Sequence, residues 1–216
     1  MKPSYNVIAG HSVERLAALS DGIFAVAMTL LVLDLHAPAK EAVHDERGLW
    51  LALGSLAPQM LAYLMSFLTL GIFWNGQQAQ LNLFRRSDRH LTWIHIAFLF
   101  AVSMMPFSTK LLSEFIENRP AMIVYWANIL LLGGVLYGSW HYAKCAGFVK
   151  EGTPPEIDKA MKGRILVAQM LYALGALLCV FNNYWSIAFI GLVQLNYAIA
   201  PNFRPRANAR QDSGAA

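Results

Sequence analysis

The sequence predicts an all-α membrane protein that crosses the bilayer six times, with one six-helix repeat in the chain. Of the 216 residues, 56% are hydrophobic and only 14% are charged, whereas soluble proteins carry about 25% charged residues. The apolar residues form runs long enough to cross a hydrocarbon core of about 30 Å as helices. Basic residues gather between these runs, where they orient membrane proteins, so the net charge of +4 does not indicate nucleic-acid binding.

The first expected span covers residues 15–35 and ends near His36. This stretch also resembles a secretory signal, because Ala37-Pro38-Ala39 imitates a cleavage site. Asp21 and Asp34 bracket its apolar core, which is atypical of a signal. We therefore expect a helix of the mature protein. A carboxylate such as Asp21 near the centre of a membrane helix costs roughly 2.5 to 3.5 kcal/mol, so we expect it to have a partner.

Prolines and charged residues divide the rest of the chain into five more spans. Pro58 indicates a helix start after an amphipathic lead-in, and Pro106 indicates a kink. The expected spans are residues 58–80, 91–115, 121–142, 165–181 and 184–200, with a polar connection over 144–164. The predicted division is a short N-terminal segment (1–14), a membrane domain (15–200) and a tail (201–216) whose composition is typical of disorder.

The basic residues are distributed unevenly between the two ends of the predicted spans. Thirteen of the seventeen lysines and arginines fall on the side that holds both termini, and the other side has Lys40, Arg47, Lys110 and Arg119. Because an excess of basic residues marks the cytoplasmic side, both termini are expected in the cytoplasm.

The same topology places several polar side chains at one depth. Asp21, Gln77 and His95 each lie six to eight residues from an arginine at the cytoplasmic end of a span, which is about 9 to 12 Å along a helix. Trp74 lies one turn from Gln77, and its indole N–H needs an acceptor when buried. We therefore predict a polar network in the cytoplasmic half of the membrane. Its members are Arg15, Ser20, Asp21, Trp74, Gln77 and His95.

Steps of 100° per residue divide the first span into two faces. Asp21 points away from a nearly apolar row centred on Val26. The row comprises Arg15, Leu19, Gly22, Ile23, Val26, Thr29, Leu30 and Leu33. By itself, such a row is more often a helix-packing surface than a functional one.

Several functional classes find no support in the sequence. It contains no P-loop, dinucleotide-binding, GxSxG or HExxH motif, so we expect neither enzymatic activity nor a cofactor. A TVGYG potassium filter is also absent. His95 and His141 as haem ligands are less plausible than histidines that hydrogen-bond within or beside a helix bundle.

Two other functional classes, and two roles for Asp34, stay open at this point. Asp21 and His95 are compatible with a proton-coupled or ion-coupled transporter, although a transporter normally carries a row of such residues. A membrane scaffold without transport activity is another possibility. Asp34, at the outer end of the first span, either attracts cations to an outer mouth or lies at the interface.

The motif Arg15-x-x-x-Leu19-Ser20-Asp21 before a long apolar run resembles the RxxxFSD motif of the transmembrane protein 175 family of potassium channels. Two further motifs follow in the order and spacing associated with this family. They are Tyr63-Leu64-x-Ser66-Phe67 with Trp74, and Pro106-Phe107-Ser108. The resemblance covers all six spans, and the single repeat is similar to that of the prokaryotic members.

The resemblance implies a homotetrameric cation channel in a prokaryotic plasma membrane, with the first span of each subunit lining the pore. The family's aliphatic constriction corresponds to Val26 and its threonine ring to Thr29, while Leu30 and Leu33 continue the column. An apolar ring favours the ion with the smaller dehydration cost. We therefore expect potassium to pass more readily than sodium, and caesium to pass as well.

The sequence departs from the family pattern at the motif phenylalanine, which is Leu19, and at two polar positions. Gln77 replaces a histidine that often follows the tryptophan, and His95 stands where asparagine is expected. The resemblance therefore does not extend to a pH response carried by that histidine. Val26 is smaller than isoleucine or leucine, which implies a wider ring and weaker selectivity.

Overall fold

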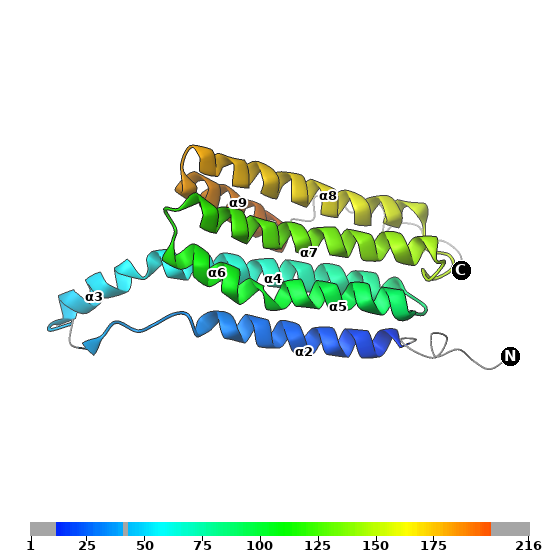
Figure 1. The fold of residues 1–216 in the computed structure, drawn as a ribbon, viewed down its shortest axis with the longest axis horizontal. Coiled ribbons are helices and arrows are strands. Elements are labelled where there is room, and N and C mark those ends of the chain that lie inside the picture. The colour runs from blue at the N-terminus through cyan, green and yellow to red at the C-terminus, as the bar shows by residue number, and fades with distance from the viewer. Residues whose placement is uncertain (1–11, 41–42, 200–216) are drawn as a thin grey trace, which may run out of the picture.

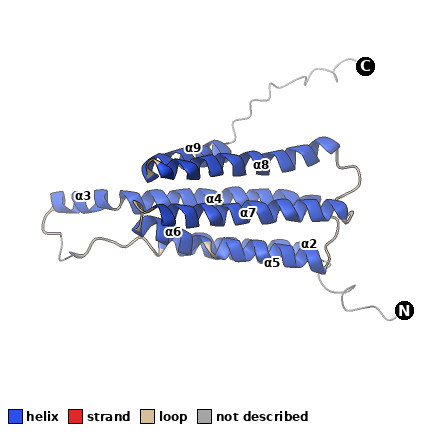
Figure 2. Ribbon diagram, turned by 45° about the horizontal axis from the view of Figure 1, so that its top comes forward, coloured by secondary structure: helices blue, strands red, loops and turns tan. Residues whose placement is uncertain are grey.

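The computed structural model describes residues 12–40 and 43–199, and their regular elements are helices joined by loops (Figure 2). The predicted all-α fold is confirmed. The elements are α2 (Val13–Val32), α3 (Glu46–Ser55), α4 (Ala57–Leu83), α5 (Arg89–Ser103), α6 (Met105–Glu114), α7 (Arg119–Cys145), α8 (Pro155–Leu177), the short 3-10 helix η2 (Leu178–Val180) and α9 (Asn183–Ile199).

The long helices lie side by side along one direction, whereas α3 projects beyond one end of the bundle (Figure 1). Five segments of the described chain are long and apolar enough to cross a bilayer, namely α2, α4, α5 with α6, α7, and α8 with η2. The 17 described residues of α9 take the place of the sixth predicted span. The chain is therefore a multi-pass membrane protein.

Short-range signals in the sequence determine where several helices begin. The Ser12 hydroxyl accepts a hydrogen bond from the Arg15 N–H and caps α2. Pro58 and Pro106 lie in the first turns of α4 and α6, where a missing N–H leaves no hydrogen bond unmade. The helix is interrupted at Met104 between α5 and α6, two residues before Pro106, where the sequence predicts a kink.

Two predicted boundaries are wrong. α2 ends at Val32, one turn before His36, because the last N–H groups bond three residues back and tighten the chain into a turn. α8 begins at Pro155, not at residue 165. Pro155 suits the first helical position, and Glu156 and Asp158 interact favourably with the helix dipole there. The polar residues 155–164 therefore continue the helix beyond its apolar part.

Aromatic side chains in the core join the first three long helices. The ring of Phe98 on α5 lies 6.0 Å from that of Phe24 on α2 and 6.4 Å from that of Phe73 on α4, measured between centroids. On the far side of the bundle, α8 and α9 pack closely at Gly175, where a Cβ would come within 2.6 Å of the Ile190 side chain. The two helices thus form a tight hairpin against α4 and α7.

Backbone pairing closes the end of the bundle at which α4 ends. The Arg85 N–H donates to the Phe148 carbonyl at 2.8 Å, and the Lys150 N–H donates to the Leu83 carbonyl at 2.9 Å. Gly147 ends α7 with a φ of +66°, a left-handed conformation that favours glycine. The α4–α5 turn and the α7–α8 loop are therefore one connected cap.

The two cysteines differ in their surroundings. Cys179 in η2 is buried, whereas Cys145 at the end of α7 is exposed, and neither is in a disulfide. Cys145 follows Lys144, whose ammonium binds the Asp158 carboxylate of α8 at 2.5 Å. Cys145 therefore lies at the end of the bundle that the α4–α5 turn and the α7–α8 loop close.

Asp88 holds the α4–α5 turn against α7. Its carboxylate accepts hydrogen bonds from the Leu91 N–H at 2.8 Å and from the Tyr142 hydroxyl at 2.7 Å. Partial burial alone would raise the pKa of this carboxyl, but the hydrogen bonds outweigh burial and hold its pKa below the ordinary value of 3.8.

Asp88→Asn tests this electrostatic contribution. Since the ionised form is bound in the native turn, its contribution to stability is present above about pH 4 and is lost as pH falls through the lowered pKa. Asparagine also caps helices but cannot release a proton. We expect a lower unfolding temperature at pH 7 and a smaller decrease between about pH 5 and pH 3, measured by thermal unfolding in detergent.

Asp88→Ala provides the comparison, because it removes the helix cap as well and should lose about 1 kcal/mol more than Asp88→Asn. An Asp88→Asn protein whose acid sensitivity equals that of the wild type would contradict this role.

Candidate functional site

The two faces of α2 differ sharply in burial. Its buried residues follow a helical repeat and pack against α4 and α5; they are Leu16, Ser20, Phe24, Ala27 and Leu31. The opposite face carries Val26, Leu30 and Leu33, which are 54%, 43% and 67% exposed. A row of uncovered aliphatic side chains on a membrane helix contacts lipid, another protein surface or a dewetting pore.

Thr29 lies in this exposed row and turns its hydroxyl hydrogen back to its own helix. The hydroxyl oxygen is 3.0 Å from the Ala25 carbonyl and 2.8 Å from the Val26 carbonyl. Because a hydroxyl has one hydrogen and two lone pairs, this arrangement leaves the oxygen able to accept from a second donor or to bind a cation on the exposed face.

A chain of buried polar side chains lies behind the apolar face. The Ser20 hydroxyl donates to Gln77 Oε1, Gln77 Nε2 is 3.3 Å from His95 Nδ1, and the Ser139 hydroxyl is 3.2 Å from His95 Nε2. All four residues are at most 1% exposed. This chain, which we call the buried polar chain, joins α2, α4, α5 and α7 at one level of the bundle.

Asp21 belongs to a second cluster on the outer side of the same level. Its carboxylate accepts hydrogen bonds from Trp74 Nε1 at 2.8 Å and from Gln78 Nε2 at 2.6 Å. Asp21 and Trp74 are both exposed and lie along a groove of about 730 Å³ between α2 and α4. The carboxylate thus has neutral donors on one side and an open groove on the other.

The structure brings together five of the six residues expected in the polar network, but in two clusters rather than one. Ser20, Gln77 and His95 form the buried chain, and Asp21 and Trp74 form the outer cluster. Arg15 is exposed, and within the described chain its guanidinium joins neither cluster. Its contact is the N–H bond to the Ser12 cap.

Sequence reasoning missed Ser139 and Gln78. Gln78 follows Gln77 on α4, and its side chain points about 100° away from that of Gln77 around the helix. The sequence therefore offered Gln78 as a second amide that could donate a hydrogen bond to Asp21. Ser139 lies in the apolar span of α7, where a single serine gives no signal of its own.

Asp34 forms an ion pair with Lys110 of α6, with 3.6 Å between carboxylate oxygen and ammonium nitrogen. Its side chain is 25% exposed. The pairing reduces the negative potential that Asp34 presents at this end of α2, so the interpretation of Asp34 as an interfacial residue is favoured over a cation-attracting mouth.

The two histidines for which haem ligation was judged less plausible differ in their surroundings. Both ring nitrogens of His95 have hydrogen-bond partners within the buried polar chain. His141 is exposed and stacks on Tyr137, with ring centroids 6.5 Å apart. His95 is therefore a structural member of the core.

Comparison with known proteins identifies the family. Residues 15–106 match the family model described as the endosomal/lysosomal potassium channel TMEM175. A potassium channel of Streptomyces collinus is 30% identical over 191 residues, which cover 85% of this chain and 90% of that protein. The chain belongs to the TMEM175 family. The resemblance noted in the sequence is thereby confirmed.

Similarity to other TMEM175 proteins extends to structure. The crystal structure of a lysosomal potassium-selective channel TMEM175 homolog from Chamaesiphon minutus aligns with a TM-score of 0.75 and 29% identity, covering 88% of this chain and 98% of that one. The mouse endosomal/lysosomal proton channel TMEM175 is 33% identical over 121 residues, 53% of this chain and 24% of that protein. As a TMEM175 protein, this chain is an ion channel, which is not an enzyme class.

Gln77→Leu tests the buried polar chain. The substitution leaves the Ser20 hydroxyl and His95 Nδ1 without their partner in the core, and we expect the free energy of unfolding to fall by about 1 to 3 kcal/mol. Thermal or denaturant unfolding in detergent measures the loss.

Gln78→Leu is the matched control, because it changes the same residue type at the next position but removes a bond at a partly exposed site. It should lower stability less than Gln77→Leu does. Equal effects of the two substitutions would show that the buried chain contributes nothing particular to stability.

Proposed function

We propose that the protein is a potassium-preferring cation channel that assembles as a homotetramer, with α2 of each subunit lining a central pore. The observation that carries this proposal is the uncovered row on α2, in which Val26, Thr29, Leu30 and Leu33 all face away from the subunit core. The names of the bacterial relatives agree with potassium as the permeant ion.

The outer polar cluster supports assembly of several copies. Asp21 is exposed on a membrane helix, and a carboxylate facing lipid is costly. A neighbouring subunit covering the groove beside Asp21 and Trp74 removes that cost. The same packing leaves the Val26 face, on the other side of α2, directed to the common axis.

An apolar ring accounts for a preference between cations without a carbonyl filter. At the proposed Val26 ring an ion must lose part of its hydration shell. The free energy of this dehydration is smaller for potassium and caesium than for sodium. The Thr29 oxygens, one turn along the helix, then offer lone pairs to the partly dehydrated ion. Selectivity is therefore expected to depend on the size of the aliphatic ring.

The distribution of basic residues supports an orientation with the termini in the cytoplasm of a prokaryotic cell. Figure 1 shows that α2 begins and α4 ends at the same end of the bundle, and the sequence places most of the described basic residues there, so we call it the basic end. Its described basic residues are Arg15, Arg85, Arg86, Arg89, Lys144, Lys150, Lys159, Lys162 and Arg164. Under the positive-inside rule this end lies in the cytoplasm.

The transporter alternative uses Asp21 and His95 as carriers of a proton or an ion. They lie in separate clusters, each with its own hydrogen-bond partners. Since the family comprises channels, passive conduction is favoured over a coupled carrier.

Val26→Ala tests the constriction. A smaller side chain widens the ring and lets sodium pass with more of its hydration, so discrimination between potassium and sodium should fall. Ion flux from proteoliposomes under potassium, caesium and sodium gradients measures this discrimination.

Val32→Ala is the matched control, because Val32 is also exposed on α2, at 47%, but lies about 120° from Val26 around the helix. It should keep the wild-type ion preference. If Val26→Ala also keeps it, or if flux requires an opposing proton gradient, the proposed constriction is wrong.

Asp21→Ala tests the bracket beside the pore. The substitution removes the acceptor of Trp74 Nε1 and Gln78 Nε2, so we expect loss of folded or assembled protein rather than a change in ion preference. Size-exclusion chromatography with light scattering reports assembly, and flux reports preference. Stable tetramers with altered selectivity would contradict this role and place Asp21 in the conduction path.

A further inference from the structure

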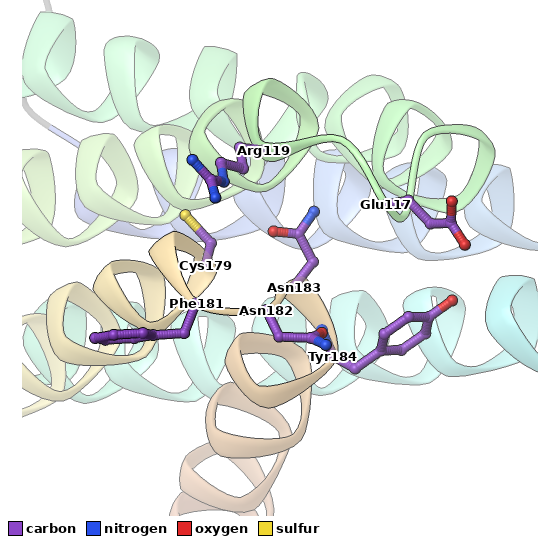
Figure 3. A pocket seen from close by; sticks show the side chains of 7 residues that line it. All are labelled: Glu117, Arg119, Cys179, Phe181, Asn182, Asn183 and Tyr184. Atoms are coloured by element: carbon purple, nitrogen blue, oxygen red, sulfur yellow. The ribbon is translucent and has the colours of Figure 1, made fainter.

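A polar pocket of about 330 Å³ lies at the end of the bundle opposite to the basic end. It forms where α7 begins and where the turn between η2 and α9 passes beneath it. Its lining residues are Glu117, Arg119, Cys179, Phe181, Asn182, Asn183 and Tyr184 (Figure 3). The pocket is distant from the α2 face and plays no part in the function proposed above.

Arg119 gives the pocket a positive charge. One guanidinium nitrogen donates to the Val180 carbonyl at 2.9 Å, and no ion pair within the described residues joins Arg119 to a carboxylate. A guanidinium has five N–H donors, so several can bind an anion. The first turn of α7, which lacks a side-chain cap, adds the positive end of a helix dipole.

Asn183 supplies a hydrogen-bond acceptor in the middle of the same pocket. Its side-chain Nδ2 donates to the Ile116 carbonyl at 2.9 Å, which determines the orientation of the amide. The residue is only 5% exposed, and its Oδ1 has no hydrogen-bond partner. Figure 3 shows Arg119 on one side of Asn183 and Glu117 on the other.

The pocket thus offers cationic donors at the Arg119 side and the Glu117 carboxylate at the other side, with the Asn183 amide between them (Figure 3). A complementary ligand carries an anionic group next to a group that donates hydrogen bonds and bears positive charge. A phosphate linked to a primary ammonium has this arrangement.

Exposed aromatic side chains around the pocket indicate the source of such a group. Phe181, Tyr184 and Trp185 are 86%, 50% and 70% exposed at the ends of two membrane helices. Aromatic residues concentrate at the level of lipid headgroups. The pocket therefore lies where a headgroup, rather than a solute in bulk water, is the abundant ligand.

We propose that this pocket binds the headgroup of a zwitterionic aminophospholipid such as phosphatidylethanolamine. Arg119 binds the phosphate, while the Glu117 carboxylate, on the other side of Asn183, accepts hydrogen bonds from the ammonium group. The site tethers the α7 start and the α8–α9 turn to the membrane surface.

Native mass spectrometry of the full-length protein, with phosphatidylethanolamine, phosphatidylglycerol and phosphatidylcholine of matched acyl chains, tests the proposal. We expect phosphatidylethanolamine to bind most tightly and Arg119→Gln to weaken it roughly tenfold or more, since a charge-assisted hydrogen bond is lost. Arg47→Gln removes the same charge at the same end of the bundle but outside the pocket, and it should bind like the wild type. Glu117→Gln should reduce the preference for phosphatidylethanolamine over phosphatidylglycerol.

Four results would overturn the proposal. If the wild type and Arg119→Gln bind the lipid equally, Arg119 does not bind the phosphate. If Arg47→Gln and Arg119→Gln lose the same lipid affinity, the effect is general electrostatic attraction between the protein and the lipid. Phosphatidylglycerol or phosphatidylcholine binding as tightly as phosphatidylethanolamine removes ammonium recognition. Displacement of the lipid by millimolar soluble phosphoethanolamine would assign the pocket to a free solute. None of these readouts depends on ion conduction, so they stand apart from the test of the channel.

Discussion

The need to satisfy polar groups inside the protein determines how the helices of this bundle are arranged. A bilayer offers no water to an unpaired amide or hydroxyl, so Ser20, Gln77, His95 and Ser139 must find one another across four helices. Their hydrogen bonds have direction, unlike the apolar contacts around them, and therefore fix the rotation of α2. Once α2 is held by its Ser20 side, its Val26 side is turned outward.

This constraint separates two tasks on a single helix. The buried side of α2 carries hydrogen bonds and tight aromatic packing, whereas the opposite side is free of ties to the rest of the subunit. A surface of that kind can meet copies of itself around an axis without disturbing the core. In the proposed channel, changes at the constriction are accordingly uncoupled from the stability of the subunit.

Sequence reasoning located the helices and the depth of the polar residues, because both follow from hydropathy and a constant rise per residue. It did not separate the buried chain from the Asp21 cluster, since depth says nothing about rotation around each helix. Arg15 was assigned to the network by its depth, although steps of 100° per residue place it in the Val26 row, away from Asp21. The polar start of α8 at Pro155 was also missed. The length of an apolar run indicates how much of a helix lies in the membrane, but the helix itself can continue beyond that run. The pore and selectivity assignments rest on the resemblance and stay predictions.

The contrast between the two cysteines has a practical consequence. With Cys179 largely buried, at 6% exposure, and Cys145 exposed at the basic end of the bundle, the more accessible thiol of the native chain lies near one membrane face. A membrane-impermeant maleimide therefore distinguishes the two insertion directions in sealed vesicles without any engineered residue. The orientation of every reconstituted sample can thus be assessed before its currents are interpreted.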